Sequence, residues 1–263
     1  MGLQDVFFEL ELPFDSQEAA ALSRRIQEEI YFHALDESCD LARVRGKHPS
    51  FKETRAAQGL LQFDLWGECP ADTERWNALK ERIREHGLRN SLLLAIAPTA
   101  TIASIVGAYE CIEPQVSNLF KRETLSGEFL QINCYLVEKL KQIGLWNDEI
   151  RNRIKQAEGS IQNIPEIPDS LRTLFRTVWE IPMRSLIDMA AGRAPFIDQS
   201  QSLNLFVESP SIGKLSSIYM YVWQKGLKTT YYLRSRPATS IAKTTVSRAV
   251  CALENPGSCE ACQ

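Results

Sequence analysis

Several features that identify common classes of protein are missing from this chain. No apolar run approaches the ~20 residues that a membrane span needs, and residues 1–6 lack the basic and apolar regions of a secretory signal. The three histidines, His33, His48 and His86, are too widely spaced to form a local metal site. The sequence also has no Walker loop, dinucleotide glycine motif or nucleophile elbow. These absences favour a cytoplasmic protein with no membrane segment and no resident metal.

A large excess of charge of either sign is also missing. The 263 residues carry a formal net charge of -3, with 44% hydrophobic and 24% charged residues, an ordinary composition for one large or two small domains. This balance argues against bulk binding of nucleic acid or an anionic membrane. Phosphates of a substrate would therefore have to be bound by local groups rather than by a basic surface.

The seven cysteines are odd in number and scattered, which is typical of a reduced, cytosolic protein rather than of a disulfide framework. Four of them have no partner at a useful spacing, and we expect each to be a small buried hydrophobic residue: Cys39, Cys69, Cys111 and Cys134.

Apolar periodicity and end signals predict an alternation of helices and strands. The first helix begins at Asp15 and Ser16 and stops near Gly46. The further helices are expected over residues 72–86, 126–143, 147–157, 169–180, 182–192 and 214–225. Strands are expected over 91–97, 202–207 and 227–233, the first of them buried on both faces. This order indicates parallel pairing in an α/β fold, and three strands are so few that the chain looks like part of something larger.

Small and hydroxyl residues follow the first predicted strand, at 97–104. In α/β folds, ligands bind at the carboxyl ends of strands. If a helix begins near Ile102, its free backbone amides and the threonine hydroxyls would form an anion site. An ordinary helix N-cap explains the same residues, because Thr and Ser begin many helices.

Two adjacent tyrosines, Tyr231 and Tyr232, lie in the last predicted strand. On a regular strand they would point to opposite faces, one into the core and one to the surface. Their rings can touch only if the strand ends or twists at this point. A touching pair would offer two phenols in series, able to pass an oxidising hole along.

The chain ends in a second pair, Cys259 and Cys262, separated by two residues. They follow residues 235–258, which have little apolar periodicity. Two thiols on a mobile arm could exchange electrons as a dithiol and a disulfide. The same pair could be half of a zinc site, although only Cys251 lies near enough to add a ligand, or it could be plain unstructured sequence.

Taken together, these segments resemble the carboxyl-terminal third of the large (alpha) subunit of class I ribonucleotide reductase. Their sequences are most similar to the bacterial class Ia forms. The similar segments occur in the order of the family and span nearly the whole chain: residues 2–7, 58–66, 89–93, 95–102, 112–114, 118–119, 125–129, 197–204, 226–234 and 259–262. Any one of them is moderately specific, and the ordered set is very specific.

The resemblance implies a substrate site at Pro98, Thr99, Ala100, Thr101 and Ile102, which would bind the diphosphate of a ribonucleoside diphosphate. Thr99 and Thr101 can offer hydroxyls, and the following amides supply the rest. Ala100 and Ile102 replace polar residues of some relatives, so side-chain contacts at these two positions would be fewer.

The resemblance also implies redox roles. Tyr231 and Tyr232 would relay an oxidising hole from a metal-containing small (beta) subunit to an active-site cysteine. Cys259 and Cys262 would re-reduce the active-site disulfide and then be renewed by thioredoxin or glutaredoxin. The helix over 214–226 is similar to one that receives the carboxyl-terminal tail of the small subunit.

The fold implied by the resemblance is the last part of a ten-stranded α/β barrel, incomplete in this chain, formed by residues 1–236, with a flexible redox tail at 237–263. In the family, the radical cysteine, its assisting Glu and Asn, a second cysteine pair and the ATP and dNTP effector sites precede the matched segment. We therefore expect no cofactor in this chain, and an amino-terminal part of the large subunit as a partner.

Three functions compete at this stage. The chain could be a reductase fragment that becomes active when an amino-terminal piece completes the barrel. It could be a non-catalytic remnant that binds the small subunit or thioredoxin. It could also be an independent thiol oxidoreductase, which is the weakest of the three because nothing near the tail would lower a thiol pKa and Glu260 would raise it.

Overall fold

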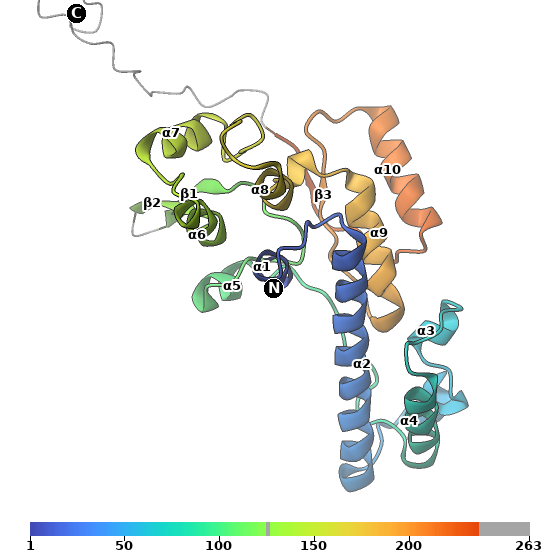
Figure 1. The fold of residues 1–263 in the computed structure, drawn as a ribbon. Helices are drawn as coiled ribbons and strands as arrows, with labels where there is room; N and C mark the ends of the chain where they lie inside the picture. The colour runs from blue at the N-terminus through green and yellow to red at the C-terminus, as the bar shows by residue number, and fades with distance from the viewer. Residues whose placement is uncertain (125–126, 237–263) are drawn as a thin grey trace, which may run out of the picture.

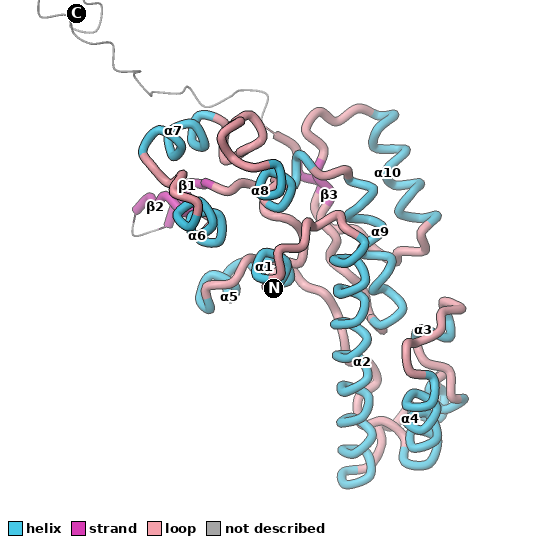
Figure 2. Tube along the Cα trace, in the orientation of Figure 1, coloured by secondary structure: helices cyan, strands magenta, loops and turns pink. Residues whose placement is uncertain are grey.

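The computed structural model describes residues 1–124 and 127–236, and helices dominate this part of the chain. Figure 2 shows how little of it is strand. The elements, in chain order, are α1 (Leu3–Glu9), α2 (Gln17–Arg45), α3 (Gln62–Leu65), α4 (Thr73–His86), α5 (Ala100–Val106), β1 (Leu119–Thr124), β2 (Gly127–Ile132), α6 (Cys134–Gln142), α7 (Asp148–Gln156), α8 (Asp169–Leu174), α9 (Met183–Arg193), β3 (Leu205–Phe206), α10 (Ile212–Gln224) and β4 (Leu233–Arg234). None of the helices in the described ranges is both long and apolar enough to cross a membrane.

The two helices with the clearest end signals form where the sequence predicts them. The side chain of Ser16 accepts a hydrogen bond from the amide of Ala19 at the start of α2. The helix ends at Gly46, whose φ of 82° is left-handed and favours glycine. In α4, Asp72 caps the start in the same way, and Gly87 ends the helix with a φ of 82°. Capping chemistry thus fixes both ends of each helix.

The long helix α2 packs against two other helices in one half of the molecule. Helix α4 lies against its carboxyl-terminal half, and α9 lies beside its first turns (Figure 1). The core between α2 and α4 is aromatic. Trp76 packs edge-on against Phe32 and Phe63, with ring centroids 5.0 and 4.8 Å apart. Burial of rings of this size is a large part of the stability of such a core.

A second core lies under α6, α7 and α8, on the other side of α1 (Figure 1). The predicted helix over 126–143 is wrong in its first half, because residues 127–132 form β2 and pair antiparallel with β1, from Leu119 opposite Ile132 to Thr124 opposite Gly127. The helix begins only at Cys134, where the side chain of Asn133 accepts hydrogen bonds from the amides of Tyr135 and Leu136. Capping by Asn133 therefore separates strand from helix.

The predicted helix over 169–180 is also interrupted. Helix α8 ends at Leu174, and only a short 3-10 turn, Val178–Glu180, follows. The carboxylate of Glu180 accepts a hydrogen bond from the amide of Thr177, so this turn has its own cap. Helix α8 and the 3-10 turn therefore form as two separate elements in place of the single predicted helix.

Three chain segments lie side by side in parallel, as the order of elements predicts. Ile96 forms a parallel bridge with Gln201, and β3 pairs in parallel with β4. The predicted burial of residues 91–97 on both faces is wrong: Leu92 is 55% exposed. In the described part of the chain only residues 199–202 pair with this segment, so its other edge has no strand beside it. The strand at 202–207 is likewise reduced to β3, and that at 227–233 to the two residues of β4.

Two helices present apolar side chains to solvent. On α5, Ile105 and Val106 are 77% and 65% exposed. On α10, Ile212 and Trp223 are 90% and 69% exposed. Exposed large apolar side chains of this kind are typical of surfaces that bind another molecule.

Candidate functional site

The loop predicted to bind phosphate leads directly into α5, with Thr99 at the N-cap position. The Thr99 side chain makes no capping hydrogen bond. Its Oγ1 instead accepts a hydrogen bond of 3.2 Å from the backbone amide of Cys111. The first bond of the helix runs from the amide of Ala103 to the carbonyl of Thr99, so the amides of residues 100–102 precede it. Thr99 therefore occupies the N-cap position of α5 without capping the helix through its side chain.

Free amides at the start of a helix attract anions, because their N–H groups and the helix dipole both point toward the ligand. Residues 100–102 are exposed, and Pro98 and Thr99 are partly buried. The hydroxyl of Thr99 accepts from Cys111, which leaves its own hydrogen free to donate. The loop can thus offer an anion a set of donors without any basic side chain.

The segment before the loop is held by one carboxylate. Asp198 accepts hydrogen bonds of 2.8 Å from the amides of both Leu93 and Leu94. Further along, the amide of Ile96 donates to the carbonyl of Ser200 at 3.0 Å. The Asp198 carboxylate therefore supplies the hydrogen-bond acceptors that a neighbouring strand would supply in a complete sheet. It thereby fixes the backbone that leads into the loop.

The rings of Tyr231 and Tyr232 touch, with centroids 4.1 Å apart and planes inclined by 60°. Both residues come just before β4, which starts at Leu233, so the alternation of a regular strand does not yet apply to them. Their backbone is nevertheless fixed: the amide of Tyr231 donates to the carbonyl of Leu203 at 2.7 Å, and the amide of Leu205 donates to the carbonyl of Tyr232 at 2.8 Å. The geometric condition for contact between the rings is met, since the strand begins only after the tyrosines, although the rings are tilted rather than stacked.

The environment of the pair is polar and open. The two phenols are 49% and 50% exposed. Interaction with the Tyr232 hydroxyl, by hydrogen bonding and by charge, raises the pKa of Tyr231 above its ordinary value. The guanidinium of Arg234 lies 5.6 Å from the centroid of the Tyr232 ring. At neutral pH Tyr231 is a protonated phenol, as a tyrosine with an ordinary pKa also is.

The segment that leads to the tyrosines is tied to residues 197–201 by side chains. The ammonium of Lys228 donates to the carbonyls of Asp198 and Gln199 at 3.0 and 2.7 Å. Partial burial lowers the pKa of Lys228. The hydroxyl of Thr229 donates to the carbonyl of Gln201 at 2.6 Å. These contacts fix the 228–232 segment against residues 199–206, the central strand of the three parallel segments.

A buried group of polar residues lies between the loop and the tyrosines. Cys111 accepts a hydrogen bond at Sγ from Nδ2 of Asn204 at 3.7 Å, and the amide of Asn204 donates to Oε1 of Glu113 at 3.0 Å. Burial, followed by the charge of Glu113, raises the pKa of the Cys111 thiol. Asn204 and Glu113 belong to segments singled out by the family resemblance, 197–204 and 112–114, but sequence reasoning gave neither a role. Asn204 and Cys111 are 93 positions apart, so no local pattern could join them.

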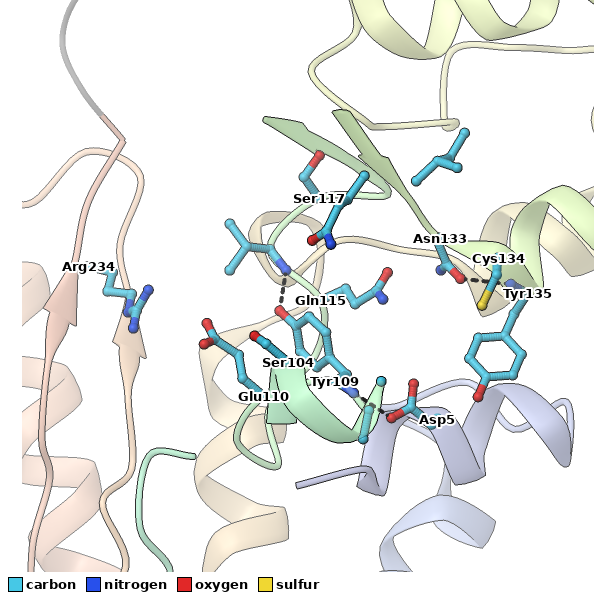
Figure 3. A pocket seen from close by; sticks show the side chains of 15 residues that line it. Asp5, Ser104, Tyr109, Glu110, Gln115, Ser117, Asn133, Cys134, Tyr135 and Arg234 are labelled. Carbon is cyan, nitrogen blue, oxygen red and sulfur yellow. Dashed lines mark hydrogen bonds between the residues drawn. The ribbon is translucent and has the colours of Figure 1, made fainter. Parts of the chain in front are cut away.

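Next to this group is a pocket of about 520 Å³ between α1, the carboxyl end of α5, β2 and β4. Figure 3 shows Gln115, Tyr109 and Asp5 around it, with Arg234 on its far side. The amide of Tyr109 donates to Asp5 at 2.7 Å, and the amide of Val116 donates to the Tyr109 hydroxyl at 2.9 Å. Burial raises the pKa of this phenol. None of the loop residues 98–102 lines this pocket, which takes only Ser104 from α5, so the amides of 100–102 lie outside it.

The cysteines divide into two groups. Cys39 and Cys111 are buried, as predicted, but Cys69 and Cys134 are exposed, which contradicts the prediction for these two. Cys69 lies in a loop after α3 and Cys134 at the start of α6, where neither has a core to enter. Cys259 and Cys262 lie outside the described residues. In the part of the chain that the structure describes, no three His, Cys, Asp or Glu side chains gather into a metal site.

Comparison with known proteins identifies a family. A family model described as "Ribonucleotide reductase, barrel domain" matches residues 1–233. The chain is 49% identical over 246 residues to the ribonucleoside-diphosphate reductase large chain of Schizosaccharomyces pombe, covering 93% of this chain and 30% of that protein. It is also 49% identical over 257 residues to the ribonucleoside-diphosphate reductase large subunit of Dictyostelium discoideum, covering 97% of this chain and 30% of that protein.

A solved structure agrees with this result. The Actinobacillus ureae class Id ribonucleotide reductase alpha subunit matches with a TM-score of 0.70 and 26% identity, over 90% of this chain and 38% of that one. The chain thus spans about a third of the length of the relatives that it matches. The bacterial class Ia subtype named from the sequence stays a prediction.

Proposed function

The chain belongs to the ribonucleotide reductase barrel-domain family, and from this premise we propose that it supplies the carboxyl-terminal part of a ribonucleoside-diphosphate reductase large subunit. The observation that carries the proposal is the tyrosine contact: two phenol rings 4.1 Å apart, on a backbone fixed by the central strand. Two touching tyrosines that are half exposed have no evident packing role, whereas a hole relay needs them in contact.

The loop at 98–102 would bind the diphosphate of the substrate. The amides of residues 100–102 and the hydroxyl of Thr99 are donors that no helix bond uses, and hydrogen bonds to a charged acceptor are about twice as strong as neutral ones. Thr101 adds a second hydroxyl. Because the loop has no lysine or arginine, orientation rather than bulk charge would select the phosphates.

Tyr231 and Tyr232 would carry the oxidising equivalent that a metal-containing small subunit supplies. When one phenol is oxidised it loses an electron and its proton, and the neighbouring phenol restores both and becomes the oxidised partner. A tyrosine is protonated at neutral pH at its ordinary pKa of about 10, and the pKa of Tyr231 is raised further by Tyr232, so oxidation of this phenol would release a proton as well as an electron. The short distance between the rings allows the transfer between them.

Cys259 and Cys262 would supply the reducing equivalents. Conversion of a ribonucleotide to a deoxyribonucleotide replaces a C–OH bond by a C–H bond and releases water, which consumes two electrons and two protons. A dithiol provides both when it becomes a disulfide. Thioredoxin or glutaredoxin would then reduce that disulfide, completing the cycle.

The direct test is reconstitution. The full chain is mixed with the segment of a related large subunit that precedes the region matched here, together with a small subunit, thioredoxin and its reductant. We expect ribonucleoside diphosphate to be reduced, and we expect Tyr231→Phe or Tyr232→Phe to lower the rate by at least about a thousandfold, or about 4 kcal/mol on the barrier. Tyr135→Phe, a conservative change on α6, serves as the matched control.

Two outcomes would contradict the proposal. A mixture that binds the small subunit but makes no deoxynucleotide would favour a non-catalytic remnant. Dithiol turnover by the chain alone, abolished by the double change Cys259→Ser, Cys262→Ser, would favour an independent thiol oxidoreductase.

A further inference from the structure

The loop at 98–102 and the tyrosine pair lie on either side of one buried residue, Asn204, which is 1% exposed. On one side, Nδ2 of Asn204 donates to Sγ of Cys111, whose amide in turn donates to Thr99. On the other side, the residues that flank Asn204 in the chain, Leu203 and Leu205, make the two backbone bonds that fix Tyr231 and Tyr232. Asn204 is thus within one residue of the tyrosine contacts and one side chain from the loop.

Residues of the 111–113 segment accept two hydrogen bonds from Asn204. Glu113, which is 4% exposed, accepts the amide of Asn204 at 3.0 Å, while Cys111 accepts its side chain. Sulfur is a weak acceptor, so the bond to Cys111 would hold little alone. The bond to the Glu113 carboxylate is the stronger kind, because the acceptor can carry a charge. Together they fix both the backbone and the side chain of Asn204.

Two features indicate that this arrangement is under constraint. Cys111 has a φ of 59°, in the left-handed region that non-glycine residues seldom occupy and that costs about 1–2 kcal/mol. The Oδ1 atom of Asn204 is buried without a hydrogen-bond partner in the described structure, and such groups are rare because they are costly. Core packing alone would not explain both costs at two residues in contact.

We infer that Asn204 is a positioning residue, which holds the diphosphate loop and the tyrosine pair in a fixed relation through Cys111 and Glu113. The inference rests on the proposed function, since it concerns how the two halves of that site are aligned. Asn204 touches neither the substrate loop nor the phenol rings in the bonds described above. Its effect on catalysis would be exerted through Cys111 on the loop and through the strand on the tyrosines.

This role predicts a particular kinetic signature for Asn204→Ala in the reconstituted enzyme. Loss of the bridge frees Cys111 and thereby Thr99, so the KM for the ribonucleoside diphosphate should rise several-fold. The backbone bond from Asn204 to Glu113 survives this change, so the strand itself stays in place, but the loop can shift relative to the tyrosines. We therefore expect kcat to fall tenfold or more, because misplacement by about 1 Å can cost about a hundredfold. A purely structural role would lower the active fraction, and hence the apparent kcat, without moving KM.

Asn118→Ala is the matched control. Asn118 is also 1% exposed, and its side chain donates to the carbonyls of Gly159 and Phe175, in the other core. This variant should lose comparable stability and leave KM unchanged. If Asn204→Ala behaves like Asn118→Ala, with an unchanged KM and an equal loss of apparent kcat, the inference is wrong.

Conservative changes at Cys111 complete the test. Cys111→Ser keeps a side chain that can bond Asn204 and should retain KM, whereas Cys111→Ala should raise it. In the double variant with Asn204→Ala, the effect of Cys111→Ala should largely disappear, since both changes break one contact. Additive effects would contradict a shared bridge. If the unchanged chain supports no reduction at all, the proposed function fails instead, so the two failures are distinguishable.

Discussion

At the scale of single residues, the contact between Tyr231 and Tyr232 has a measurable electrostatic effect. The Tyr232 hydroxyl raises the pKa of Tyr231, so the Tyr231 phenol should ionise at a higher pH than an isolated tyrosine, whose pKa is about 10. Tyr232→Phe removes both the hydrogen bond and the second ionisable group, and the pKa of Tyr231 should fall toward its ordinary value. The ring-carbon NMR shift of labelled Tyr231, followed through alkaline pH, measures this. An unchanged titration would show that the hydroxyls do not interact.

Thr99 is the residue where the proposed binding of a diphosphate by the loop at 98–102 can be tested most simply. Thr99→Val keeps the shape of the side chain but removes both the acceptor for the Cys111 amide and the donor to a phosphate. A hydrogen bond to a charged group is worth about 1.5–3 kcal/mol, so KM for the diphosphate should rise roughly 10- to 100-fold. Thr99→Ser retains the hydroxyl and should stay close to the original KM. Equal effects of both variants would exclude a role for the hydroxyl.

At the scale of elements, the segment from Leu93 to Ile96 depends on a single carboxylate where a sheet would supply a strand. Asp198→Ala should lower the free energy of unfolding by about 2 kcal/mol, since two backbone amides lose a charged acceptor. Asp198→Asn keeps one acceptor oxygen and should lose about half of that. Urea unfolding measures both. Asp169→Ala, whose carboxylate is 88% exposed in its pair with Arg172, should change stability very little, and a loss equal to that of Asp198→Ala would contradict this account.

The elements that the sequence predicts well are those whose ends carry their own chemistry. Ser16 and Gly46 bound α2, and Asp72 and Gly87 bound α4, because capping and left-handed termination act within a few residues. The hairpin β1–β2 was missed for the opposite reason. The sequence predicts one apolar helix over 126–143, because short apolar runs do not distinguish strand from helix. Here the cap at Asn133 was the signal that could have divided them.

The candidate site was predictable only in part, for a related reason. The loop and the tyrosines stand out as local patterns, and the structure supplies the touching rings that the relay requires. The residues between them do not stand out, because Cys111 and Asn204 meet only through the fold. The burial of 91–97 was mispredicted because an apolar run shows that a segment can be buried, while the neighbours that would bury it are absent from the described part of the chain.

At the scale of the whole molecule, the chain exposes apolar surface on two helices, α5 and α10, and we expect it to self-associate when isolated. Ile105→Lys on α5 and Trp223→Lys on α10 should each shift it toward the monomer in sedimentation velocity. Val44→Lys is the matched control, because Val44 is 77% exposed on α2 without such a cluster around it. If the control has the same effect as the two variants, general charge rather than these surfaces governs association.

The openness of the tyrosine pair has a further consequence. About half of each tyrosine is in contact with solvent, so an oxidised ring would be open to small reductants before it could pass the hole on. In the proposed relay, a partner that docks over the pair would therefore also have to shield it, shutting out dissolved electron donors while a ring is oxidised. A dye or spin trap that intercepts the radical only when this cover is loosened would reveal the shield directly.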